Sequence, residues 1–140
     1  MADRSGQYDL IDERPLCIYG RQRGEDQCPS NLENFKQAIQ AAVDFAERFG
    51  PQLMVQTFID AARMLAVRYQ LYRDSNVILE HWRLADPHIA EVMKHCAVID
   101  IQIYGEPNST VMDRMREMLE DGCATQVPRL SGFVRLTSSD

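Results

Sequence analysis

Three histidines at seven-residue intervals are the residues most suggestive of metal chemistry. His81, His88 and His95 have this spacing, and Glu91 lies between the last two. On one continuous helix, His88, Glu91 and His95 would share a face. However, His88 and His95 would then be two turns apart, roughly 10 Å along the axis, whereas a single ion requires each ligand atom about 2 Å away. The spacing therefore predicts an exposed helix face and no metal site.

Two arginines between two glycines are a candidate for anion binding. Tyr19 precedes residues 20–24, Gly-Arg-Gln-Arg-Gly, a predicted loop whose amides and guanidinium groups suit a phosphate. The tyrosine ring can stack on a base, but two acidic residues follow the loop at once and can neutralise it. RNA or nucleotide binding is therefore the alternative function, through Tyr19, Arg21, Arg23, Arg129 and Arg135.

Covalent catalysis and cofactor binding have no recognisable motif. A nucleophile requires serine or cysteine beside a base, and the chain has no Gly-x-Ser-x-Gly, Walker or dinucleotide-binding sequence. The cysteines at 17, 28, 96 and 123 lie in or beside apolar runs, where burial keeps a thiol protonated. We predict free, mostly buried thiols, no catalytic residues and no cofactor, which favours a protein that is not an enzyme.

The composition is that of one globular domain. The chain has 140 residues, 45% of them hydrophobic and 26% charged, which disfavours disorder. A net charge of −6 opposes non-specific binding to nucleic acid or anionic lipid. No apolar run approaches the ~20 residues of a membrane span, and the polar N-terminus is unlike a signal peptide, so we expect a cytoplasmic protein. The predicted organisation is a flexible arm over 1–15, one domain over 16–137 and a polar tail over 138–140.

Three segments have strand character. Residues 16–19 form a short apolar run that Gly20 ends, and residues 97–104 alternate isoleucines with polar side chains. This alternation predicts a strand with one wet face. A last strand is expected over 132–137, so that residues 97–137 would form a parallel β-α-β crossover.

Apolar periodicity predicts helices over most of the remaining chain. A capping-box pattern at Ser30–Glu33 begins a helix that Gly50 ends. The segment 51–73 is apolar around most of a helical circumference, so it must be covered on nearly every side. A break near Asp86-Pro87 separates two further helices, and the last is expected over 110–121.

The expected fold is α+β and predominantly helical, with about five helices, a two- or three-stranded sheet and the order β-α-α-α-α-β-α-β. Arg68 lies off the polar strip of segment 51–73 and would be half-buried, which requires a carboxylate partner. The excess apolar surface favours a non-enzymatic interaction protein, such as a phage, viral or bacterial accessory factor, that forms a homodimer or binds another protein. Its expected interface residues are Phe58, Met64, Arg68, Tyr69, Tyr72 and Trp82.

Overall fold

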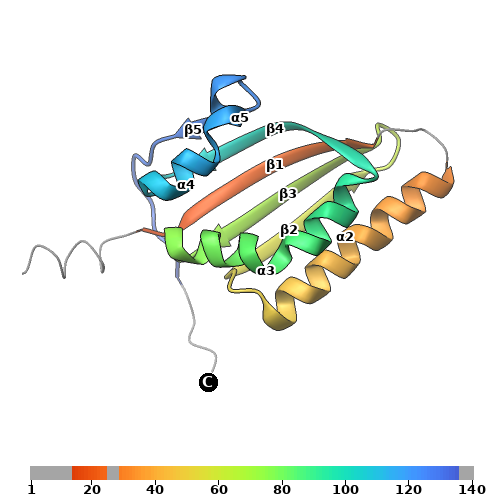
Figure 1. Cartoon of the computed structure of the whole chain (residues 1–140), viewed down its shortest axis with the longest axis horizontal. Helices are drawn as coiled ribbons and strands as arrows, with labels where there is room; N and C mark the ends of the chain where they lie inside the picture. Colours follow the sequence, from red (N-terminus) through yellow and green to blue (C-terminus); the bar gives the residue numbers. More distant parts are fainter. Residues whose placement is uncertain (1–13, 25–28, 136–140) are drawn as a thin grey trace, which may run out of the picture.

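The computed structural model describes residues 14–24 and 29–135, which form one sheet with a layer of helices on one of its faces (Figure 1). The expected arm over 1–15 lies outside the described residues except for Arg14 and Pro15, as does the tail over 138–140. The elements in chain order are β1 (Leu16–Gly24), α2 (Pro29–Phe49), β2 (Met54–Asp60), β3 (Leu65–Tyr72), α3 (Ser75–Met93), β4 (Cys96–Tyr104), α4 (Ser109–Arg114), α5 (Arg116–Glu120) and β5 (Ala124–Val127).

The sheet has five strands in the order β2-β3-β1-β4-β5. All neighbouring strands are antiparallel except β4 and β5, which are parallel. The succession β1-α2-β2-β3-α3-β4 is the ferredoxin-like arrangement, and α4, α5 and β5 extend it at one edge. The parallel pairing expected in this unit is present, but its second strand is 124–127, and residues 132–135 form no strand.

The expectation of a predominantly helical fold with a two- or three-stranded sheet is wrong, chiefly because segment 51–73 is a β-hairpin. Strands β2 and β3 pair along their whole length. Their turn contains no glycine, asparagine or proline, the residues that normally mark a turn, and Met64 adopts a left-handed φ of 54° there. Because both faces of the hairpin carry apolar side chains, its composition imitates that of a helix buried on all sides.

The helices differ from expectation at Pro87. Helix α3 runs without a break through this proline, although an internal proline costs a helix about 3 kcal/mol. Ile78 and Val92, on opposite sides of it, are both buried in the core, and this shared burial favours the continuous helix. The predicted strand at 97–104 and the helices at 30–49 and 110–121 are confirmed, the last as the two short helices α4 and α5. The capping side chains of Ser30 and Asn31 lie outside the described residues.

The two faces of the sheet have different environments. Side chains of Leu16, Ala66, Tyr72 and Ile103 are buried against the helices. Because successive side chains of a strand alternate between faces, their neighbours lie on the open face. The covered face therefore holds the core and any enclosed site. No helix among the described residues is long and apolar enough to cross a membrane.

Candidate functional site

A polar cluster lies between the sheet and helices α2 and α3, where an apolar core is expected. Arg68 and Gln70 come from β3, Gln52 precedes β2, and His81 comes from α3; all four line a cavity of about 20 Å³. This volume holds about one water molecule. The apolar wall of the cavity is formed by Ala42, Val43, Ala46, Val55, Ala85, Ile89 and Val92, with His88 also contributing.

Arg68 is the unusual member of this cluster. Its Nε and Nη2 atoms are buried and have no hydrogen-bond partner, and burial lowers the pKa of the guanidinium. The carboxylate partner predicted from the sequence is not found: no salt bridge between described residues includes Arg68. Arg68 as a whole is half-buried, and burying part of a cation without a counter-ion is costly.

His81 is held neutral and in one orientation beside Arg68. Gln52 Nε2 donates to His81 Nδ1 at 2.8 Å and to Gln70 Oε1 at 3.2 Å. With the Gln52 amide in this orientation, Nδ1 is the acceptor and the neutral ring carries its proton on Nε2. Burial, assisted by the charge of Arg68, lowers the pKa of His81 to about 4. At neutral pH His81 therefore acts as a hydrogen-bond donor through Nε2.

Further unsatisfied polar atoms surround this group on the covered face. Thr57 Oγ1, Gln22 Oε1 and Gln52 Oε1 are buried without a partner. Thr57 is the direct cross-strand partner of Arg68, and such partners have Cβ atoms roughly 5 Å apart. Buried polar atoms normally have partners, so their concentration here indicates a site that is completed by a ligand or by water.

A groove between α2 and the edge strand β2 approaches this cluster from outside. It has a volume of about 510 Å³ and is lined by Lys36, Ile39, Gln40, Val43, Asp44, Val55, Gln56, Thr57 and Ile59. Val43 and Val55 line both the groove and the inner cavity. The groove therefore ends at the wall behind which Arg68 lies.

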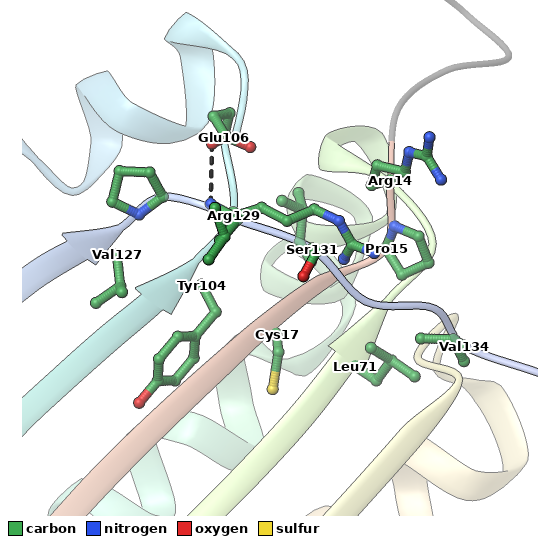
Figure 2. Close-up of a pocket in the computed structure, with 14 residues that line it drawn as sticks. Arg14, Pro15, Cys17, Leu71, Tyr104, Glu106, Val127, Arg129, Ser131 and Val134 are labelled. Carbon is green, nitrogen blue, oxygen red and sulfur yellow. Dashed lines mark hydrogen bonds between the residues drawn. The ribbon is translucent and has the colours of Figure 1, made fainter.

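A second hollow, of about 380 Å³, lies beside the C-terminal segment (Figure 2). Figure 2 shows Cys17, Leu71, Tyr104 and Val127 on the strands beneath this segment. The main-chain N–H of Arg129 donates to Glu106 Oε1 at 3.0 Å, and its guanidinium donates to the Gly132 carbonyl. None of the residues lining the hollow has an unpartnered buried side-chain atom, so its polar groups do not require a ligand.

The expected interface residues do not share one surface. Phe58 and Tyr69 lie on the open face with ring centroids 6.2 Å apart, and both are exposed. Arg68 and Tyr72 lie on the covered face, and Met64 is buried at the hairpin turn. Trp82 is half-buried against the core under α3.

The arginines of the alternative function are also separated. Residues 20–24 belong to strand β1 and form no loop, and Arg21 lies 3.5 Å from Asp100 in an ion pair. Arg129 lines the hollow beside Cys17, and Arg23 is six residues farther along β1, about 20 Å away. Arg135 lies over the Phe133 ring. Tyr19 is close to Tyr69, with ring centroids 5.1 Å apart.

The three histidines occupy three environments, so the expectation of a uniformly exposed face is wrong. His81 is buried, His88 stacks 4.5 Å from Phe45, and His95 lies 3.7 Å from Glu91. Within the described ranges, no group of histidine, cysteine or acidic residues has a metal-binding arrangement. Cys96 is buried and its thiol donates to the Val92 carbonyl at 3.4 Å, whereas Cys17 and Cys123 are half-buried thiols that form no disulfide. Cys28 lies outside the described residues.

Comparison with known proteins identifies structural neighbours only. No protein-family model and no curated protein sequence matches the chain. The crystal structure of MupZ from Pseudomonas fluorescens aligns with a TM-score of 0.67 at 12% identity, over 91% of this chain and 100% of that chain. SnoaB, a cofactor-independent oxygenase from Streptomyces nogalater, aligns with a TM-score of 0.55 at 9% identity, over 69% and 96%. A putative antibiotic biosynthesis monooxygenase from Caulobacter crescentus CB15 gives 0.56 at 12%, over 70% and 94%. The chain shares their fold.

These neighbours correct the functional expectation. The expectation of a non-enzymatic interaction module, with RNA binding as the alternative, is contradicted: the chain shares the fold of SnoaB and of the Caulobacter protein, and atoms of Arg68, Thr57 and Gln52 are buried without partners. The expectation of a protein partner stays a prediction. Gln52, Thr57 and Gln70 were not among the candidates from the sequence, and His81 was assigned to an exposed helix face. Arg68 and Gln70, two residues apart in an apolar run, have the spacing of one strand face.

Proposed function

We propose that this chain is an enzyme-like protein that binds a small organic substrate and places an anionic oxygen of that substrate on Arg68. The observation that supports this proposal is the guanidinium of Arg68, which has two buried, unpartnered nitrogen atoms and no carboxylate partner among the described residues. An arginine fork forms strong charge-assisted hydrogen bonds with such an oxygen. Desolvation strengthens the attraction.

The surrounding groups suit a substrate whose oxygen becomes negatively charged during reaction. Arg68 stabilises that charge, and the Nε2–H of neutral His81 can add a second donor without adding a positive charge. Stabilisation of a carboxylate, enolate or phenolate by fixed donors needs no bound cofactor. The cofactor-independent activity of SnoaB agrees with such chemistry in this fold.

Binding of 4-nitrophenol tests the proposal, because its phenolate absorbs in the visible range and its neutral form does not. The wild-type protein should bind the phenolate and lower the ionisation midpoint of the bound phenol. Arg68→Met should abolish this shift, whereas the matched control Arg73→Met, at an exposed arginine just after β3, should retain it. An equal shift in wild type and Arg68→Met would refute the role of Arg68.

Circular dichroism separates loss of binding from loss of fold. Arg68→Met removes an unpaired buried charge, so the variant should remain folded. The cytoplasmic location expected from the sequence stays part of the proposal, and fractionation of the native host would test it.

A further inference from the structure

We infer that the cavity at Arg68 is the inner end of a channel that opens at the α2–β2 groove, and that the substrate is an elongated organic anion. Its anionic head would lie at Arg68, an apolar body would pass between Val43 and Val55, and its outer end would lie in the groove. The placement of the anionic head at Arg68 depends on the proposed function. The placement of the outer end depends only on the groove.

The inner cavity is too small to hold a substrate alone. Its volume of about 20 Å³ accommodates about one water, so it has room only for the oxygen atoms of a head group. Ligand sites for small molecules usually have volumes of about 300–1,000 Å³. The remaining volume must come from a neighbouring space, and the groove of about 510 Å³ lies within that range.

Three residues lie at the boundary between the groove and the inner cavity. Val43 of α2 and Val55 of β2 line both of them. Thr57 lines the groove and is the cross-strand partner of Arg68, which lines the cavity. The unpartnered Thr57 Oγ1 therefore lies at the junction, where it can bind a polar atom next to the head group.

The groove has the lining that an elongated amphipathic molecule requires. Ile39, Val43, Val55 and Ile59 are apolar, and they suit a hydrocarbon or aromatic body. Lys36, Gln40 and Asp44 follow one another at intervals of four along α2, so they form a row on one face of the helix. This row extends for about 12 Å, and it can bind polar groups at the outer end of the ligand.

Two straight-chain carboxylates, butanoate and octanoate, test the channel by calorimetry. Butanoate reaches only the inner part, whereas octanoate extends into the groove. Because the added methylene groups become buried, octanoate should bind wild type at least about tenfold more tightly. Equal affinities of the two anions would overturn the inference.

A tryptophan in the groove gives the decisive variant. Gln40→Trp fills the groove at an exposed helix position, so it should weaken octanoate binding by at least about tenfold and leave butanoate binding unchanged. The matched control Gln37→Trp lies on the same helix, is also exposed and does not line the groove. Octanoate bound on the open face of the sheet would be insensitive to Gln40→Trp, and that result would also overturn the channel.

Arg68→Met distinguishes failure of the channel from failure of the proposed function. If both are correct, this variant weakens both carboxylates, and Gln40→Trp weakens only octanoate. If Arg68 does not bind the head group, Arg68→Met leaves both affinities unchanged, and the proposed function fails. If Arg68→Met weakens both anions but Gln40→Trp weakens neither, the proposed function stands and the channel is refuted.

Discussion

The arginines on the two faces of the sheet differ in whether they have a counter-ion. On the open face, Arg21 lies beside Asp100 at 3.5 Å, and both side chains reach solvent. On the covered face, Arg68 has buried nitrogen atoms and no ion pair with any described residue. Both residues are half-buried and both have a buried Nε without a hydrogen-bond partner, but the charge of Arg21 has a counter-ion and that of Arg68 has none among the described residues. The difference indicates that the covered face maintains an unfavourable group for a purpose other than stability.

The aromatic residues of the two faces also differ in burial and hydrogen bonding. Tyr19 and Phe58 each pack against Tyr69 on the open face, and all three remain partly exposed. Tyr72, on the covered face of the same strand as Tyr69, is fully buried, and its hydroxyl donates to Gln70 at 2.9 Å. Burial raises the pKa of Tyr72, so its hydroxyl remains a donor. The covered face thus contains an ordered polar network within the core, whereas the open face has solvated, mutually packed rings.

The largest expected effect is on the free energy of unfolding, which a truncation on the covered face should lower far more than one on the open face. Ile103 is fully buried on β4, and its neighbour Gln102 lies on the open face, paired with Tyr19. Ile103→Ala should lower the free energy of unfolding by about 2–4 kcal/mol because it leaves a cavity. Gln102→Ala should change it by less than about 0.5 kcal/mol. Urea denaturation measures both, and equal losses would show that the faces do not differ as described.

The next effect separates buried His81 on α3 from half-buried His95, which follows this helix, by the pH dependence of stability. The pKa of His81 is about 4 in the folded protein against an ordinary value of 6.5. Because the folded pKa is depressed, both states are neutral above pH 6.5, and the unfolded state binds the extra proton as the pH falls. Stability should therefore decrease between pH 6.5 and 4, by at most about 3 kcal/mol.

Two histidine variants assign this pH dependence. His81→Gln should flatten the decrease in that pH window, measured as the unfolding free energy at several pH values. His95→Gln, at the half-buried position beside Glu91, should retain it. A slope that persists in His81→Gln would mean that other groups cause it.

The sequence predicted those elements whose patterns have a single explanation. The strand over 97–104 alternates strictly, and the helix ending at Gly50 has one apolar stripe with a conventional stop, so both are confirmed. The hairpin was missed because its turn, Ala61–Met64, has no glycine, asparagine or proline and its one turn signal is Asp60, whose Oδ1 accepts from Arg63 N–H at 3.2 Å. Both faces of its strands are also apolar. The fold class was wrong for this one reason above all others.

The candidate site was less predictable than the fold. The sequence predicted a carboxylate partner for Arg68, which the described residues do not supply. It also assigned Arg68 to an interface, since a helix places Arg68 and Gln70 on different faces and a strand places them on the same one. Gln52, Thr57 and His81 come from separate elements, and only the folded chain brings them together. Gln52 and Thr57 share with Arg68 a buried atom without a hydrogen-bond partner, which is a property of the tertiary structure and has no counterpart in the sequence.

The smallest expected effect is a change in the free energy of unfolding whose sign differs between Arg68→Met and Arg21→Met. Arg68→Met replaces an unpaired buried charge with an apolar chain of similar length, so it should raise the free energy of unfolding, by about 1 kcal/mol. Arg21→Met removes a partly exposed ion pair and should lower it by less than about 1 kcal/mol. High salt should reduce the Arg21 effect and leave the Arg68 effect unchanged, because screening acts mainly on exposed charges. If Arg68→Met instead lowers stability, the guanidinium contributes to the fold itself, and its missing partner no longer indicates a binding site.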